Sequence, residues 1–192
     1  MQQPHKRDTA VIALGANLAR ANAALQTTII QSIDVIARTI GPITRKSRLF
    51  RTPCFPAGAG PDYVNAVIAL ETTLSPQDIL LQLHKIEAEF GRARAVRWGS
   101  RTLDLDLLAV ADRVLPDTKT QTQWRSLSVV EQGKRAPETL ILPHPRLQDR
   151  AFVLVPMAEI AADWMHPVLG LSVAQMLSQL PAGAVAEVQA LV

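Results

Sequence analysis

Residues 102–108 read TLDLDLL, a run in which leucine and aspartate alternate. Successive side chains of a β-strand point to opposite faces, so this run predicts a strand from Thr102 to Val110 whose leucines face a core. Asp104 and Asp106 then lie side by side on the other face, with their Cα atoms about 6.6 Å apart. Aspartate is uncommon in strands, and two adjacent carboxylates repel each other. The chain must therefore build a sheet with one buried face and an acidic pair on the opposite face.

The strands and helices expected before this segment follow a recognisable order. Apolar and β-branched runs bounded by turn residues predict three earlier strands, at 9–14, 43–52 and 63–73. Apolar residues at three- and four-residue spacing predict two helices, over 19–40 and 76–90. With the acidic strand, the order is β-α-β-β-α-β. This order predicts an α+β fold with a ferredoxin-like core, in which two helices pack on one face of a mostly antiparallel sheet.

The remainder of the chain is less regular. Residues 115–138 are polar, rich in turn residues and without a clean period, which predicts a surface insertion. The apolar pattern predicts a helix over 148–161, interrupted or bent at Pro156, a short helix over 172–180 and a last strand over 184–192. We interpret the 192 residues, of which 48% are hydrophobic, as one domain (1–192) with a C-terminal helical extension.

Composition excludes several classes of protein. A single cysteine, Cys54, rules out a disulfide framework and a zinc site built from cysteines. The uncharged stretch after Asp163 is broken by polar residues and prolines, so it does not predict a membrane span. Lys6 and Arg7 precede an apolar run, as in a secretory signal, but Asp8 abuts that run and glycine soon ends it. We therefore interpret the run as the first strand.

Arginines gather immediately before the acidic strand. Fifteen of the 20 basic residues are arginine, and four stand in the loop with Trp98: Arg92, Arg94, Arg97 and Arg101. Guanidinium groups grip phosphate oxygens and paired carboxylates hold divalent cations, so this layout indicates a site for a polyphosphate and magnesium. Two simpler interpretations stay open: the acids face solvent, or the arginines neutralise them directly. The sequence lacks GxxxxGK[ST], so metal and side chains would have to hold a nucleotide.

Two further groups of residues suit a flat, charged ligand. Tyr63, the only tyrosine, and Asn65 share a strand face, as in sites that stack and read a planar heterocycle. A turn followed by a strand explains these two residues equally well. His144 stands between two prolines in a stiff, extended segment, and Arg150 and Phe152 follow it. A lone histidine is more often structural, but here a cation and an aromatic ring lie close by in the sequence.

Four motifs together resemble the 6-hydroxymethyl-7,8-dihydropterin pyrophosphokinase family. They are ALGANL, RTPCF followed by PDYVNAVIALET, IEAEFGRARAVRWGSRTLDLDLL, and LPHPRLQDRAFVLVP, and they run from Ala13 to about Pro156. The resemblance implies a ferredoxin-like fold and an ATP-dependent diphosphokinase of folate biosynthesis. Such an enzyme transfers the β,γ-pyrophosphoryl unit of ATP to the hydroxymethyl oxygen of the pterin and releases AMP.

The resemblance also implies roles for residues at matching positions. Asp104 and Asp106 would hold two Mg²⁺ ions around ATP, the co-substrate. The catalytic set would be Asp104, Asp106, Arg92, Arg101 and His144. The ATP-binding set would be Glu87, Arg92, Arg94, Arg97, Arg101, His144 and Arg150. The pterin-binding set would be Thr52, Pro53, Phe55, Tyr63, Asn65, Trp98 and Phe152, with the ring stacked between Tyr63 and Phe152.

The sequence departs from the family pattern at several places. Ala16 stands where serine is commoner, and Thr139 stands where an arginine can occur. The interval from Arg94 to Arg97 is short, and the insertion at 115–138 has no counterpart in compact members. The implied partners are ATP and the dihydropterin, with no nucleic acid and no membrane. We expect a monomer, since no heptad or long apolar edge is visible, and a cytoplasmic location, since the implied substrate is ATP.

Three alternatives remain at this stage. A ferredoxin-like sheet with basic loops could bind RNA, but the aromatic RNA-binding strand motif is missing. A different metal-dependent phosphotransferase or nuclease could use the same fold. A scaffold that has lost activity would be expected to have lost some of the acids, the histidine or the stacking pair, all of which the sequence retains.

Overall fold

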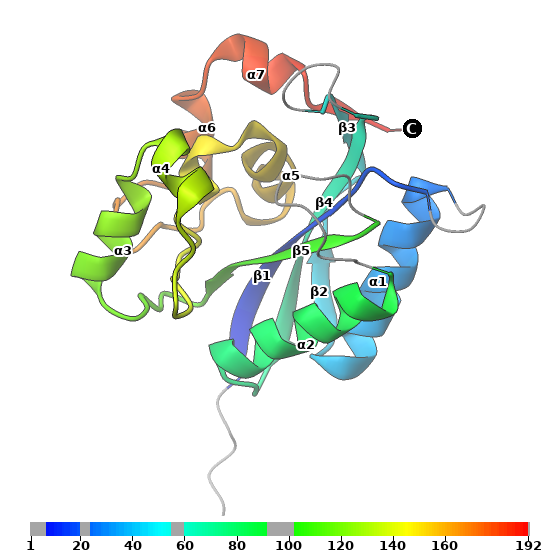
Figure 1. The fold of residues 1–192 in the computed structure, drawn as a ribbon, viewed down its shortest axis with the longest axis horizontal. Helices are drawn as coiled ribbons and strands as arrows, with labels where there is room; N and C mark the ends of the chain where they lie inside the picture. Colours follow the sequence, from blue (N-terminus) through cyan, green and yellow to red (C-terminus); the bar gives the residue numbers. More distant parts are fainter. Residues whose placement is uncertain (1–6, 20–23, 55–59, 92–101, 192) are drawn as a thin grey trace, which may run out of the picture.

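The centre of the molecule is a six-stranded sheet (Figure 1). The computed structural model describes residues 7–19, 24–54, 60–91 and 102–191. The strands are β1 (Asp8–Ala16), β2 (Ile43–Lys46), β3 (Phe50–Thr52), β4 (Tyr63–Thr72), β5 (Asp104–Val110) and β6 (Gln189–Ala190). Their order is β5-β1-β4-β3-β6, with β2 also paired to β4, and each of these pairings is antiparallel. The predicted α+β class and mostly antiparallel sheet are confirmed.

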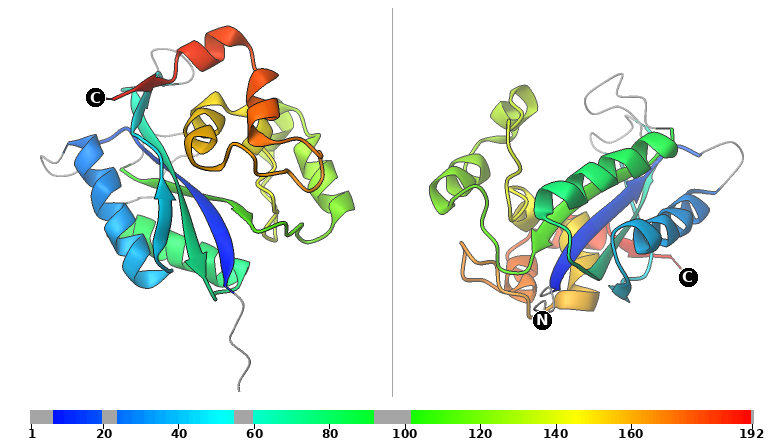
Figure 2. Two further views of the ribbon diagram at one scale, coloured as in Figure 1. Left: turned by 180° about the vertical axis from the view of Figure 1, so that it is seen from behind. Right: turned by 90° about the horizontal axis from the view of Figure 1, so that it is seen from below.

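Two helices cover one face of this sheet, as predicted (Figures 1 and 2). They are α1 (Leu25–Thr39) and α2 (Pro76–Glu89). Their buried side chains, among them Ile36 and Leu83, pack with the leucines of the acidic strand in one core cluster. Ser75 caps α2, because its hydroxyl accepts a hydrogen bond from the backbone N–H of Asp78 at 3.1 Å. α1 begins at Leu25, later than predicted, because Ala24 is in an extended conformation.

The opposite face carries the C-terminal helices, which the ferredoxin-like prediction did not place there. α5 (Ala151–Ala161) and α6 (Val173–Ser178) pack on this face, with the short 3-10 turn η1 (Leu147–Asp149) before α5. Their core cluster includes Val67 and Leu108 from the sheet. The helix predicted over 148–161 is divided at Arg150, with η1 before this residue and α5 after it. Pro156 lies inside α5 and does not end it, because its ring is buried and only one backbone N–H is lost.

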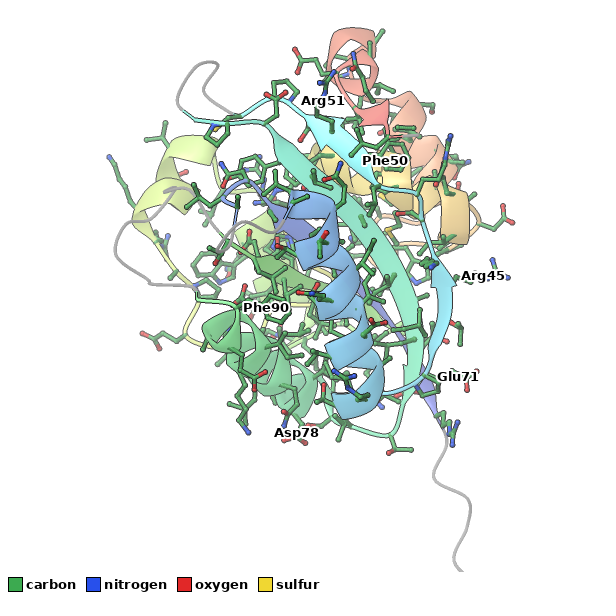
Figure 3. All side chains as sticks on the ribbon, turned by 90° about the vertical axis from the view of Figure 1, so that its right-hand side faces the viewer. Arg45, Phe50, Arg51, Glu71, Asp78 and Phe90 are labelled. Carbon is green, nitrogen blue, oxygen red and sulfur yellow. The ribbon has the colours of Figure 1, made fainter. Side chains whose placement is uncertain are left out.

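Three predicted strands have different limits in the structure. The strand expected over 43–52 is two strands. At Ser47 the N–H still donates to the Val67 carbonyl at 2.9 Å, but the Val67 N–H donates to the Ser47 hydroxyl, at 3.0 Å. β1 continues through Gly15, which was expected to end it, because that residue pairs with strands on both sides. The strand expected over 184–192 begins inside a helix, α7 (Ala182–Ala186), and only β6 is strand. Phe50 of β3 lies beside this C-terminal segment (Figure 3).

The predicted insertion contains two short helices beyond the edge strand β5 (Figure 1). They are α3 (Thr118–Arg125) and α4 (Val129–Lys134). The side chains of Asp117 and Ser128 cap their first turns, a local signal that does not depend on any apolar period. The segment is polar as expected, yet Gln121 is fully buried. Among the described residues, no helix is both long and apolar enough to cross a membrane.

Candidate active site

The alternation in the acidic strand is confirmed. Leu103, Leu105 and Leu107 are at most 3% exposed and pack under α1 and α2. Asp104 and Asp106 are half-buried on the opposite face of β5. Opposite them on β1 stand Gly15 and Ala13, respectively. The acids therefore lie beside a strip of the sheet whose side chains are a hydrogen and a methyl group.

The same strip separates the acids from the predicted pterin residues. Gly15 pairs with Asp104 on one side and with Asn65 on the other. Residues directly opposite each other in a sheet share a face, so the acid and the amide face the same side, about 10 Å apart at Cα. A Cβ added at Gly15 would lie 3.0 Å from Asn65 Oδ1 and 3.9 Å from Tyr63 Cδ1. The missing side chain is therefore what lets the amide approach β1.

Asn65 is held in place from the neighbouring strand. Its Nδ2 donates to Thr52 Oγ1 at 2.7 Å, and both side chains are buried. Thr52 pairs with Tyr63 in the ladder between β3 and β4, and Pro53 follows it on the exposed side. An amide with one N–H engaged in this way has a fixed orientation and keeps its oxygen for another donor. The arrangement suits recognition of a ring edge that carries N–H groups.

Arg150 joins the acids to the predicted stacking residue Phe152. Its Nη1 lies 3.2 Å from Asp106 Oδ2, and its guanidinium carbon lies 5.5 Å from the centroid of the Phe152 ring. Phe152 is 39% exposed at the start of α5. The arginine paired with Asp106 is thus none of the four loop arginines, which lie outside the described residues, but one that stands 44 residues further along the chain. Nothing local in the sequence indicated this pairing.

His144 is attached to the outer edge of the acidic strand. Its backbone N–H donates to the Leu108 carbonyl at 2.8 Å, and its Nδ1 accepts the backbone N–H of Arg146 at 3.1 Å. Burial lowers the pKa of His144 to about 4; the Asp106 carboxylate opposes this shift, and the guanidinium groups of Arg150 and Arg146 add to it. The imidazole is therefore neutral near pH 7. Since Nδ1 is an acceptor, the proton is assigned to Nε2, which can donate to a ligand.

Glu87 lies beneath the acids. It is 1% exposed on α2, and its Oε1 accepts the backbone N–H of Leu105 at 2.9 Å. Leu105 stands between the two aspartates, so this carboxylate fixes the strand at the position where the acids are presented. The family resemblance implies a role for Glu87 at the nucleotide, whereas its described contact is with the backbone of β5.

Several predicted site residues lie outside the described ranges: Phe55, Arg92, Arg94, Arg97, Trp98 and Arg101. Within the described ranges, no cluster of three or more His, Cys, Asp or Glu residues could hold a metal by itself. The sequence reasoning missed the strip at Ala13 and Gly15. The signal available for it was the ALGANL motif, because a glycine inside a strand often marks a close approach of a neighbouring group.

Comparison with known proteins identifies the family. The model of the 7,8-dihydro-6-hydroxymethylpterin-pyrophosphokinase family matches residues 11–162. This chain belongs to that family. A 2-amino-4-hydroxy-6-hydroxymethyldihydropteridine pyrophosphokinase of Synechocystis is 37% identical over 95% of this chain and 81% of its own length. A pyrophosphokinase of the same name from Haemophilus influenzae is 36% identical over 83% of this chain and 85% of its own length.

The fold agrees with this membership. The crystal structure of wild-type HPPK-DHPS from Plasmodium falciparum matches with a TM-score of 0.65 and 14% identity, over 91% of this chain and 41% of that one. The predicted function is confirmed at the level of the family: the chain is an ATP-dependent pyrophosphokinase that transfers pyrophosphate from ATP to hydroxymethyldihydropterin in folate biosynthesis.

Proposed function

We propose that the two substrates lie side by side across Gly15, with the triphosphate of ATP over β5 and the pterin over β4. The observation that carries this proposal is the row Asp104–Gly15–Asn65, in which acid and amide share a face and the residue between them in the row has no side chain. Pyrophosphoryl transfer requires the two reactants to be held in line and in contact. A glycine between a phosphate-type site and a ring-edge site suits that requirement.

On the β5 side, Asp104 and Asp106 would hold Mg²⁺, in two ions as the resemblance implies. The donor set fits, because paired, half-buried carboxylates are the oxygen ligands that Mg²⁺ prefers when substrate phosphates complete its coordination. When bound, the metal supplies neutralisation of the phosphate charge. Arg150, now paired with Asp106, would move its guanidinium to the phosphates, and the neutral His144 would donate from Nε2. Arg92, Arg94, Arg97 and Arg101 would grip the same phosphates, and buried Glu87 would support β5 beneath them.

On the β4 side, the pterin would stack between Tyr63 and Phe152. Asn65, oriented by Thr52, would read the ring edge with its Oδ1, helped by the backbone at Thr52 and Phe55. Pro53 and Trp98 complete the proposed pterin set.

The proposed reaction needs no protein nucleophile. The hydroxymethyl oxygen forms a bond to the β-phosphorus, the bond from that phosphorus to the bridging oxygen of AMP breaks, and the hydroxyl proton is released. The chain's part is to bind, align and neutralise. We further propose that residues 1–192 act as a single pyrophosphokinase domain, as a monomer in the cytoplasm, where ATP is available. Sedimentation at working concentration would test the oligomeric state.

A product assay tests the proposed chemistry. ATP, Mg²⁺ and 6-hydroxymethyl-7,8-dihydropterin are mixed with the protein and the nucleotides are resolved. We expect AMP and pyrophosphorylated pterin in equal amounts, and neither product when the metal is chelated. ADP as the product would contradict the transfer of a pyrophosphoryl unit.

Substitution of the acids tests their proposed role. Asp104→Ala and Asp106→Ala should abolish turnover while the folded state persists, because both side chains face away from the main core. Circular dichroism and thermal melting check the fold. A collapse of the melting temperature in either variant would indicate a structural role for that acid instead.

A further inference from the structure

The insertion at 115–138 is tied to the segment that carries His144. Leu115 and Leu142 exchange two backbone hydrogen bonds, at 2.8 and 3.1 Å. A few residues on, Gln121 Nε2 donates to the Pro143 carbonyl at 3.2 Å. Two attachments in succession place this polar excursion directly against the histidine segment. The insertion is therefore more than a solvent-exposed extension.

The burial of Gln121 sets it apart from its own helix. It is 0% exposed, whereas Lys119 and Gln123 on the same helix are exposed. Burying a primary amide is unfavourable unless its polar atoms find partners, and a leucine of similar size would avoid this cost. Among the described residues, its Nε2 has a partner in the Pro143 carbonyl and its Oε1 has none, so the bond to Pro143 is what accounts for a glutamine at this position.

The Pro143 carbonyl and the His144 N–H belong to one peptide group. The carbonyl accepts from Gln121 of the insertion, and the N–H donates to Leu108 of the acidic strand at 2.8 Å. A peptide group is planar and rigid, so bonds on both of its sides fix its orientation. The Cα of His144 is bonded directly to this group. Its imidazole is thereby directed to the region of Asp106 and Arg150.

We infer that Gln121 is a positioning residue for the ATP site, acting from the insertion through the Pro143–His144 peptide to hold the His144 imidazole beside the acidic strand. The inference rests on the ATP-binding role proposed above for His144. It gives residues 115–138 a function in this enzyme. The His144 Nε2–H would then donate to a phosphate of the bound ATP from an orientation that the insertion maintains.

The test uses two variants at Gln121 and a matched control. Gln121→Met keeps the volume and removes the donor, while Gln121→Ala removes both, so a folding defect in one leaves the other informative. Gln123→Ala removes an exposed glutamine from the same helix. Binding of α,β-methylene-ATP with Mg²⁺ is measured by calorimetry, because its methylene group replaces the oxygen at the bond that is broken. The His144 imidazole is followed by ¹⁵N NMR after assignment with His144→Ala.

We expect both Gln121 variants to weaken binding of the analogue by about three- to tenfold, the loss typical of one hydrogen bond, and Gln123→Ala to leave it unchanged. The imidazole signals should shift in the Gln121 variants only. In a His144→Ala background, Gln121→Met should cause no further loss. Equal losses with and without His144 would overturn the inference, as would unchanged imidazole signals. If His144→Ala alone leaves binding unchanged, the proposed role of His144 fails, and the NMR signals still decide whether Gln121 positions it.

Discussion

Adding a single methyl group at Gly15 should weaken binding at the proposed pterin site and leave binding at the proposed ATP site unchanged. In Gly15→Ala, the new Cβ would stand 3.0 Å from Asn65 Oδ1, and ordinary contact begins at 3.4 Å, so the amide must move by about 0.4 Å. Asn65 is restrained by its 2.7 Å bond to Thr52, so the displacement strains or breaks that bond. A disturbed hydrogen bond of this kind is worth about 1 kcal/mol. Pterin affinity should therefore fall about fivefold, since 1.4 kcal/mol corresponds to a factor of ten.

Stability should change little in the same variant. The shift of Asn65 is unfavourable, but replacing glycine by alanine restricts the unfolded chain and stabilises by about 0.4–1 kcal/mol. Gly183→Ala is the matched control, because no described atom lies within 4 Å of its new Cβ. Pterin and α,β-methylene-ATP dissociation constants and melting temperatures are measured for both variants. Loss of ATP affinity with unchanged pterin affinity would refute the reasoning, and so would an equal loss of pterin affinity in Gly183→Ala.

Three further predictions concern charge and burial. Glu87→Ala should lower the free energy of unfolding by about 1–3 kcal/mol, because the buried N–H of Leu105 loses its acceptor. Glu87→Gln keeps the acceptor and should lose less. Urea unfolding distinguishes the two variants, and equal losses would contradict this account. Arg150→Met should raise the pKa of His144 above about 4, since the Arg150 guanidinium is one of the groups that lower it. NMR titration of His144 measures the change. An unchanged pKa would count against an interaction between the two side chains. Burial, with a contribution from a nearby arginine, lowers the pKa of His166 to about 4, against about 6.5 unfolded, so the unfolded chain takes up the proton first. Stability should thus be full above about pH 6.5 and fall towards pH 4, by up to about 1.4 kcal/mol per pH unit; urea unfolding at pH 7.5 and 5.0 checks this, and greater stability at pH 5.0 would reverse the sign.

Much of the fold could be predicted because its signals are local. The alternation in 102–108 determines which side chains face the core, and Ser75 with Pro76 marks the start of α2. Where local signals compete, prediction failed. Glycine often ends a strand, but Gly15 has ladder partners on both neighbouring strands. Proline often breaks a helix, but Pro156 is buried inside α5.

For the site, the chain supplied the residue types, and the structure decided which of them meet. The acidic pair, the Tyr63–Asn65 face and the His144 segment can each be recognised from a short stretch of sequence. Two pairings cannot be recognised in this way: that of Arg150 with Asp106 and that of Gln121 with Pro143. Each joins segments 22 or more residues apart in the sequence. Such contacts depend on strand register and on where α5 and the insertion pack.

The sequence by itself determined the β-α-β-β-α-β order of the core, the acidic face of β5 and the family. Periodicity, capping and motif spacing depend on neighbouring residues and do not require knowledge of distant ones. Only the tertiary structure decided that the C-terminal helices cover the second face of the sheet, and that Gly15 stands between Asp104 and Asn65. A sheet register is fixed by the packing of all its strands together, so the row that brings the two proposed substrate sites side by side exists only in the folded chain.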